Sequence, residues 1–376
     1  MSNKRICLIA NSGFTIVNFR AELIKELIFS DNDVIVICPL ECDLMHGRDL
    51  TEEFSNLGVK FVPIVINRSG INPISEFNLL ISLYNVLRNE MPDVVLNYTI
   101  KPTIYGSFAA WLAGVKYIAS NITGLGYVFT TRSIGSFILS SIIKLQYKLA
   151  LRCNSIVFFQ NPDDEALFKK LSLTSSVKTK VIDGSGVDVA KFIRKNFDPK
   201  PHSFIFVGRL LCDKGVKELI GAAEIIKSKY PHAIITLLGS IDNNPSSLTE
   251  YDLKDYIASG VINYLPARPD VRDALDEHEV FVLPSYREGT PRSVLEAMSM
   301  SMPIITTDVP GCRETVVSGT NGFLVEPKNA EKLAIAMEEF ILKPDLVKKF
   351  GEASRELAIN RYEVNKVNES ILSEFI

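Results

Sequence analysis

Short apolar runs alternate with helical patterns along the whole chain, and this alternation constrains the fold more than any other feature of the sequence. Short strands separated by amphipathic helices are typical of βαβ units, whose strands run parallel. We therefore predict an α/β fold with doubly wound parallel sheets. The expected strands of the first half span 5–10, 33–38, 59–66, 93–97, 116–120, 155–159 and 178–183, and the helices span 18–29, 75–90, 102–113, 134–152 and 162–171. A second series of strands spans 204–207, 233–238, 261–265, 279–283, 303–306 and 322–325.

The length of the chain and a break in this pattern indicate two domains. A chain of 376 residues is long for one hydrophobic core and comfortable for two. The segment 189–202 separates the two series of strands, contains two prolines and lacks periodicity, which is typical of a linker. We expect a first domain over 1–188 and a second domain over 203–357.

Composition argues against several classes of function. The net charge of −3 indicates no general affinity for nucleic acid, and no uncharged apolar run reaches the roughly 20 residues that a membrane-spanning helix needs. The six cysteines contain no C-x-x-C pair, so we expect reduced, mostly structural cysteines of a cytosolic protein. The four histidines show no metal-ligand spacing, and the D-x-D at Asp31-Asn32-Asp33 precedes an expected strand instead of ending one. We expect no catalytic metal.

The segment 285–297, S-Y-R-E-G-T-P-R-S-V-L-E-A, carries two carboxylates around the start of an expected helix. Thr290 is expected to cap this helix, with Pro291 as its first residue. Glu288 then lies in the loop after a buried strand, where open α/β sheets bind ligands, and Glu296 lies about one turn into the helix. Carboxylates around an anion-attracting helix start suit a ligand with both phosphates and hydroxyls, such as a sugar nucleotide. The spacing alone also fits a solvated loop glutamate and a helix-dipole glutamate.

A second segment, F-I-F-V-G-R-L-L-C-D-K-G from Phe204 to Gly215, forms an expected strand, a tight loop and a helix start. Arg209 follows the strand directly and Lys214 comes five residues later. Both side chains suit a diphosphate, the guanidinium through its fork of donors and the ammonium as a point charge. From this segment alone, an exposed basic loop is an equal interpretation.

Together the two segments resemble family 4 glycosyltransferases. Glu288 and Glu296, with the flanking Gly289, Pro291 and Ala297, resemble the E-x7-E signature of that family, and G-R-L-x-x-x-K-G resembles its diphosphate-binding segment. The resemblance implies a GT-B architecture, in which two Rossmann-like doubly wound domains face a central cleft and a last helix, here 363–375, returns to the first domain. It also implies configuration-retaining transfer from a nucleotide sugar.

The resemblance assigns roles to residues of both segments. Glu288 would contact the donor sugar, Glu296 would hold the ribose hydroxyls, and Arg209 with Lys214 would stabilise the departing diphosphate. The catalytic candidates are thus Arg209, Lys214 and Glu288. The candidates for binding the nucleotide sugar are Gly13, Gly208, Arg209, Lys214, Glu288, Gly289, Thr290, Pro291 and Glu296.

Weaker candidates rest on a resemblance to a bacterial subgroup that builds lipid-linked surface glycans. The run P-G-C-R-E at 310–314 and the arginine inside the E-x7-E segment both recur in it. A turn glycine and an exposed first-turn arginine explain these two residues equally well. Many relatives have a histidine after the fifth strand that contacts the donor sugar, and this chain has none there. The weaker candidates for acceptor or phosphate are Arg20, Asn121, Thr123, Arg292 and Gly311.

The 69 residues from Val94 to Pro162 contain no Asp or Glu, although the whole chain has 44 acids. Lys144, Lys148 and Arg152 recur at i, i+4 and i+8 on one face of an expected helix that is otherwise apolar. Basic amphipathic surfaces bind anionic lipid, so these three residues are candidates for membrane contact. A core helix with a solvated basic face is the alternative.

Residues and resemblance together predict a retaining glycosyltransferase. We expect it to move a hexose or N-acetylhexosamine from a UDP-sugar to a polyprenyl-diphosphate-linked saccharide in surface glycan biosynthesis. The expected partners are the nucleotide sugar, that acceptor and the anionic inner face of the cytoplasmic membrane, without nucleic acid and without a cofactor beyond the donor substrate. Two alternatives remain: an isomerase similar to UDP-N-acetylglucosamine 2-epimerase, and a non-enzymatic subunit that binds sugar nucleotides.

Overall fold

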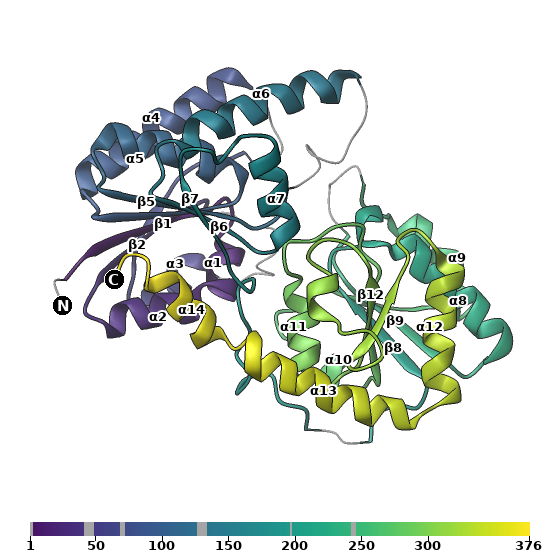
Figure 1. Cartoon of the computed structure of the whole chain (residues 1–376). Coiled ribbons are helices and arrows are strands. Elements are labelled where there is room, and N and C mark those ends of the chain that lie inside the picture. The colour runs from purple at the N-terminus through teal and green to yellow at the C-terminus, as the bar shows by residue number, and fades with distance from the viewer. Residues whose placement is uncertain (1–2, 41–48, 68–71, 126–133, 196–197, 242–245) are drawn as a thin grey trace. The chain divides into compact units, whose positions relative to one another are not determined.

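The chain divides into two compact units of similar size. The computed structural model describes residues 3–40, 49–67, 72–125, 134–195, 198–241 and 246–376. The first unit comprises Met1–Ser185 together with Val367–Ile376, and the second comprises Gly186–Lys366. Figure 1 follows the chain through both units and ends with helix α14 back at the first.

Seven parallel strands form the sheet of the first unit, in the order β3-β2-β1-β4-β5-β6-β7. Successive residues of a strand point to opposite faces, and helices cover both faces. One face buries Ile6 and Leu8 under α1–α3 and the end of α14, and the other buries Cys7 and Ile9 under α4 and α5. The strands are β1 Arg5–Ile9, β2 Asp33–Cys38, β3 Lys60–Pro63, β4 Val94–Tyr98, β5 Tyr117–Ile122, β6 Ile156–Phe159 and β7 Lys178–Val181. The helices are α1 Gly13–Phe19, α2 Ala21–Phe29, α3 Leu50–Asn56, α4 Pro73–Glu90, α5 Ser107–Ala113, α6 Ile134–Leu151, α7 Pro162–Lys170 and α14 Val364–Leu372.

The helices of the first unit differ from the sequence expectation in three places. The helix predicted over 18–29 is two helices, α1 and α2, because Arg20 leaves the helical conformation with φ −128° and ψ −2°. The helix predicted over 102–113 begins as a π-helical turn, Pro102–Gly106, before α5. Helix α3 lies where no helix was predicted. At α4 the local signals agree with the structure: Asn72 caps the helix by accepting a hydrogen bond from the Ile74 N–H, and Pro73 follows it.

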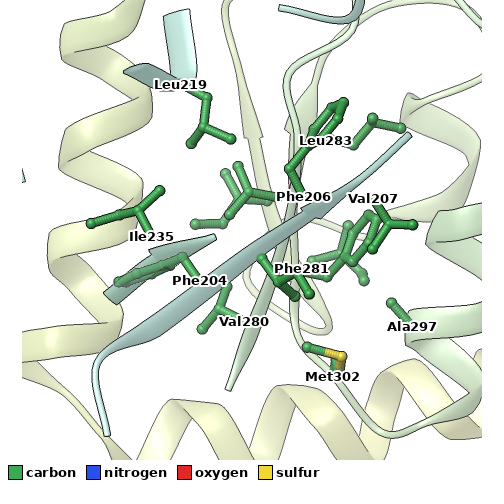
Figure 2. Close-up of a cluster of buried hydrophobic side chains, with 14 of the residues drawn as sticks. Phe204, Phe206, Val207, Leu219, Ile235, Val280, Phe281, Leu283, Ala297 and Met302 are labelled. Carbon is green, nitrogen blue, oxygen red and sulfur yellow. The ribbon is translucent and has the colours of Figure 1, made fainter. Parts of the chain in front are cut away.

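Six parallel strands form the sheet of the second unit, in the order β10-β9-β8-β11-β12-β13. Its core is built around β8 and β11, where Phe204, Phe206 and Phe281 are fully buried (Figure 2). The strands are β8 Ser203–Val207, β9 Ile234–Gly239, β10 Asn263–Pro266, β11 Val280–Leu283, β12 Ile304–Thr307 and β13 Gly322–Val325. The helices are α8 Val216–Lys229, α9 Glu250–Ala258, α10 Arg272–Asp276, α11 Arg292–Ser299, α12 Ala330–Leu342 and α13 Asp345–Arg361.

The boundary between the units differs in one respect from the sequence expectation. The segment 189–202, expected as a linker, belongs to the second unit, where Phe192 is 6% exposed and joins the hydrophobic core. The C-terminal residues Ile371 and Phe375 are buried in the core of the first unit instead. The chain therefore passes between the units twice, near residue 185 and near residue 366.

Candidate active site

The strand order of the second sheet places its ligand-binding edge between β8 and β11. From β8 the chain continues to β9 on one side, and from β11 it continues to β12 on the other. In open α/β sheets, ligands bind outside the carboxyl ends of strands at such a switch point. Arg209 and Lys214 follow β8, and Glu288 follows β11, so the three candidates emerge at this edge.

The structure brings Lys214 and Glu288 into contact. Lys214 ends the 3₁₀ turn Cys212–Lys214, and its Nζ forms an ion pair with Glu288 Oε1. The Ser285 hydroxyl also donates to this oxygen, at 2.6 Å. Both charged side chains are largely buried, with 24% and 11% exposed. The pair thus holds one cation and one carboxylate in a fixed position at the switch point.

The loop that carries Glu288 is fixed by its neighbours on both sides. The Glu288 N–H donates to the carbonyl of Pro310 at 3.0 Å, and the Tyr286 N–H donates to the carbonyl of Asp213 at 2.9 Å. Gly311 has φ +83°, and a Cβ at this position would lie 2.2 Å from the carbonyl oxygen of Gly289. A glycine is therefore required there for packing of the loop. This gives Gly311 a role that needs no contact with a ligand.

The second glutamate of the segment lies on α11, which begins one residue later than predicted. Pro291 adopts an extended conformation with φ −72° and ψ 111° and precedes the helix, so Arg292 is its first residue. Arg292 Nε donates to Glu296 Oε1 at 3.1 Å, and both side chains are 16% exposed. Burial raises the pKa of Glu296, and the neighbouring Arg292 partly opposes this effect. Arg292 is thus a partner of Glu296 rather than an exposed first-turn arginine.

The remaining candidates of the second unit line the same two loops. Gly208 follows β8 directly, and its carbonyl oxygen would lie 1.7 Å from a Cβ on Gly239, so the two backbones approach closely. The other three lie in the loops that carry Lys214 and Glu288: Arg209 and Thr290 are half-buried, and Gly289 is buried.

The first unit has a switch point of its own, between β1 and β4. Arg20 follows β1 and α1, and only 5% of it is exposed. Its guanidinium carbon lies 4.3 Å from the ring centroid of Tyr98, the last residue of β4, which is a cation–π contact. Burial raises the pKa of the Tyr98 hydroxyl. A buried arginine is thereby held at the carboxyl edge of this sheet.

Unpartnered polar groups lie close to Tyr98, in the register of the sheet and in the chain that follows it. Asn121 of β5 pairs with Tyr98 of β4 and is 3% exposed. Within the described part of the chain, neither its amide nitrogen nor its oxygen has a hydrogen-bond partner, and the same holds for the buried hydroxyls of Thr99 and Thr103. Thr99 has φ +75°, a strained conformation for a β-branched residue. Buried polar groups without partners and local strain are typical of binding sites.

Sequence reasoning identified Arg20 and Asn121 but missed Tyr98 and Thr99. The signal that could have identified them is the polar run N-Y-T at 97–99, which lies at the end of the fourth strand. The other two candidates of this unit are Thr123 and Gly13. Thr123 is half-buried after β5. Gly13 begins α1, and a Cβ on it would lie 2.5 Å from the Leu50 side chain, so close packing explains this glycine.

The D-x-D segment lies away from both switch points. Asp31 has φ +58° in a turn, and Asp33 begins β2 at its amino end, as predicted. The Asn32 side chain accepts a hydrogen bond from the Lys4 N–H and so holds this turn in place. Within the described ranges, no cluster of three or more His, Cys, Asp or Glu residues is suited to hold a metal ion.

The three membrane candidates lie at α6. Lys144 and Lys148 are half-buried, and Arg152, just after the helix, is exposed. Among the helices that the structure describes, none combines the length and the apolar character needed to cross a membrane.

Comparison with known proteins identifies the family. Residues 189–357 match the family described as glycosyl transferases group 1, and residues 5–161 match the one described as glycosyl transferase 4-like. The UDP-Gal:alpha-D-GlcNAc-diphosphoundecaprenol alpha-1,3-galactosyltransferase of Escherichia coli is 30% identical over 74% of this chain and 73% of its own length. The chain is a group 1 glycosyltransferase. A second relative, the N,N'-diacetylbacillosaminyl-diphospho-undecaprenol alpha-1,3-N-acetylgalactosaminyltransferase of Campylobacter jejuni, is 29% identical over 92% of each chain.

The fold of this glycosyltransferase is also that of solved relatives. A glycosyltransferase from Rickettsia africae matches 99% of this chain and 98% of its own with a TM-score of 0.76, at 20% sequence identity. The resemblance to family 4 glycosyltransferases and the GT-B fold class, with its two Rossmann-like doubly wound domains, are therefore confirmed.

Proposed function

We propose that this glycosyltransferase moves a hexose or N-acetylhexosamine from a UDP-sugar to a polyprenyl-diphosphate-linked saccharide, with retention of anomeric configuration. The observation that carries the proposal is the ion pair of Lys214 and Glu288 at the switch point of the second sheet, where Arg209 also follows β8. Both relatives described above are named for undecaprenyl-diphosphate-linked acceptors, and the one from E. coli is named for UDP-galactose. These names support the substrate classes.

In the proposed reaction, the bond from the anomeric carbon to the diphosphate breaks as the bond to the acceptor oxygen forms. Arg209 and Lys214 stabilise the negative charge that develops on the departing diphosphate. The proton of the acceptor hydroxyl passes to that diphosphate. Glu288, held by Lys214 and Ser285, accepts hydrogen bonds from the donor sugar. Glu296 accepts hydrogen bonds from the ribose hydroxyls, and the cationic groups take the place of a metal ion.

The first unit supplies the proposed acceptor site. Arg20 is held on Tyr98 at the switch point of that sheet, where a guanidinium suits a diphosphate or the hydroxyls of a sugar. The unpartnered amide of Asn121 and the hydroxyl of Thr99 can each donate and accept a hydrogen bond, as a saccharide requires. An acceptor that forms these bonds would satisfy groups that the described chain leaves unsatisfied.

A polyprenyl acceptor is held in a bilayer, so we place the protein at the inner face of the cytoplasmic membrane. The acid-free stretch from Val94 to Pro162 and the cations Lys144, Lys148 and Arg152 support this placement.

The decisive experiment measures nucleotide release from a panel of UDP-sugars, with and without a polyprenyl-diphosphate-linked saccharide. We expect release from one UDP-sugar to depend on the acceptor and to yield a product in which the anomeric configuration of the donor is retained, as read by NMR. An inverted product would overturn the retaining mechanism. Formation of an epimeric UDP-sugar without acceptor would favour an isomerase, and binding without turnover would favour a non-enzymatic subunit.

A second experiment tests the proposed independence from metals. Because cationic side chains stabilise the leaving group in the proposed reaction, turnover should persist in the presence of EDTA. Loss of turnover with EDTA, followed by recovery on addition of Mn²⁺ or Mg²⁺, would contradict this part of the proposal.

A further inference from the structure

Helix α4 carries a row of exposed apolar side chains on the side that faces away from its sheet. Its buried residues, Leu79, Leu83 and Leu87, pack on the strands of the first unit. On the opposite side, Ile74, Phe77 and Ile81 are 72%, 61% and 41% exposed. The spacing i, i+3, i+7 places these three residues in one row along the helix.

Helix α6 repeats this arrangement. Its Tyr147, Ala150 and Leu151 are buried in the core of the first unit. Ile142, Leu145 and Leu149, again at i, i+3 and i+7, are 50%, 57% and 42% exposed. The outward side of α6 thus carries an apolar row next to the exposed Ser141, and Lys144 and Lys148 lie half-buried beside this row.

Helix α5 connects the two rows. It packs against α4 and α6, and the three helices lie on the same side of the sheet (Figure 1). Its Trp111 and Leu112 are 61% and 53% exposed. We refer to the exposed apolar side chains of α4, α5 and α6 together as the apolar helical face. Groups of large exposed apolar side chains on neighbouring helices are more typical of an interaction site than single exposed ones.

Most charged side chains around the apolar helical face, among the described residues, are basic. In α4, Glu76 is buried and forms an ion pair with Lys101 at 2.5 Å. Glu90, the last residue of α4, is 18% exposed and pairs with Lys60 at 2.7 Å, so neither acid is left uncompensated. Helices α5 and α6 lie inside the acid-free stretch from Val94 to Pro162. Lys116 after α5 and Arg152 after α6 are both exposed. The surroundings of the face therefore complement an anionic surface.

We propose that the apolar helical face inserts into an anionic lipid bilayer, to the boundary between headgroups and acyl chains. Two features bind interfacial helices to membranes: apolar side chains that enter this boundary, and cations that surround them. The inference rests on the proposed function, in which the acceptor is membrane-held. It goes further because the main contact is apolar insertion by three helices, whereas the cations of α6 alone would give an electrostatic contact that salt abolishes.

Trp111 is the one tryptophan of the chain and lies within the face, so it reports insertion directly. Vesicles of phosphatidylglycerol and phosphatidylcholine should shift its emission to shorter wavelength, and brominated acyl chains should quench it. A substantial part of the vesicle binding should persist in 0.5 M salt, because apolar insertion is not screened. Unchanged emission with saturating vesicles, or complete release by salt, would overturn the proposal.

A pair of matched variants tests the apolar contribution. The double variant Phe77→Ser and Leu145→Ser should lower the partition coefficient on these vesicles at least about tenfold, because it removes two large apolar side chains from the inserted surface. Phe29→Ser is the control, since Phe29 is 91% exposed on α2, which covers the other face of the sheet. Equal losses in both, with thermal unfolding unchanged, would contradict insertion by this face.

Two further measurements separate this inference from its rivals. A concentration-dependent shift of Trp111 emission without lipid, together with dimers in gel filtration, would show that a second copy covers the face and would overturn the proposal. Turnover of a short-chain, water-soluble acceptor by the double variant should equal that of the parent, whereas turnover of a long-chain acceptor in vesicles should fall. Vesicle binding without any turnover by the parent would count against the proposed function alone.

Discussion

Lys214 and Glu288 form an ion pair in which each member has a different proposed partner in the bound donor. Pairing keeps both side chains in position before a ligand arrives, and the small exposed fractions limit the screening of their charges. A diphosphate that binds at this edge would share the ammonium with the carboxylate. The pair thus serves to preorganise the site, which is the condition under which a cation contributes most to stabilising a transition state.

Removal of either cation should therefore impair turnover much more than folding. We expect Lys214→Ala and Arg209→Ala each to lower kcat/KM by about 100- to 1,000-fold, as is typical when one preorganised electrostatic group is lost. Lys217→Ala, which removes an exposed lysine of the neighbouring helix α8, is the control and should leave kcat/KM unchanged. Steady-state rates near those of the parent in both variants would refute the assignment of the diphosphate site.

Glu296 should make nucleotide binding sensitive to acid. Burial raises the pKa of its carboxyl above the ordinary value of about 4.5, so protonation begins at higher pH than for an exposed glutamate. The protonated form accepts ribose hydrogen bonds less well, and the affinity for UDP should fall as the pH is lowered toward this raised pKa. Calorimetric titration from pH 7.5 to 5 checks this. In Glu296→Gln the affinity should be lower at pH 7.5, and only the pH dependence of UDP itself should remain; equal pH profiles in both proteins would exclude the role.

Individual site residues differ in how far the sequence revealed them. Arg209 and Glu288 became candidates through the resemblance of two segments to family motifs, since their spacing alone also fitted exposed charged loops. Thr99 was not a candidate, because its importance comes from its positive φ and its buried hydroxyl, which exist only once β4 is placed next to β1. Gly311 was identified as a candidate ligand contact, but its close approach to the backbone of Gly289 depends on neighbours distant in sequence.

Whole elements were predicted better than their boundaries. Strand and helix order follows from the alternation of apolar runs, and both doubly wound sheets agree with it. The break between α1 and α2 had no local signal, since it is associated with the burial of Arg20 against Tyr98. The start of α11 was misplaced by one residue because proline is common both at the first helical position and just before it. In α4 and α6, apolar residues recur with helical spacing on the buried side and on the exposed side. The sequence pattern therefore does not indicate which side of each helix is exposed.

The loop between β11 and α11 offers a test of how much of the site depends on one close contact. Gly311→Ala introduces a Cβ about 2.2 Å from the Gly289 carbonyl oxygen at φ +83° and should displace the loop that carries Glu288. Gly319→Ala is the matched control, with φ +79° and no atom within 4 Å of the added Cβ.

Both variants bear the cost of a left-handed conformation, about 1–2 kcal/mol. Only Gly311→Ala should also lose turnover and UDP affinity. Both quantities are measured for each variant at a temperature chosen so that the proteins have equal stability. If both variants keep the kinetics of the parent, the loop tolerates the added methyl group and the packing role of Gly311 is wrong.

At the scale of the whole molecule, the C-terminal segment completes the core of the unit in which the chain begins. Ile371 and Phe375 belong to the hydrophobic core of the first sheet, and the centroid of the Phe375 ring lies 5.8 Å from that of the Tyr117 ring of β5. Charged groups add to this contact, since Glu374 pairs with Lys178 at 2.5 Å and Lys180 at 3.1 Å. The return of the last helix to the first domain was implied by family resemblance, whereas composition gave no indication of it.

Truncation of one side chain in this segment should destabilise the first unit. Ile371 is 2% exposed, so Ile371→Ala should lower the free energy of unfolding by about 2–5 kcal/mol through lost burial and a residual cavity. The control Ile376→Ala removes a side chain that is 42% exposed and should have little effect. Urea unfolding of both variants, followed by circular dichroism, provides the measurement. Equal midpoints would show that the segment contributes no stability to the unit.

The two passages of the chain between the units also govern how related enzymes can recombine. A single crossover near residue 185 joins the first 185 residues of one parent to the rest of another, so the first unit receives its final helical residues, 367–376, from the wrong parent. With two crossovers, near residue 185 and near residue 366, all residues of each hydrophobic core come from the same parent enzyme. In chimera construction we therefore expect the second unit to behave as an inserted domain, and exchange of everything beyond one junction to yield a mismatched core.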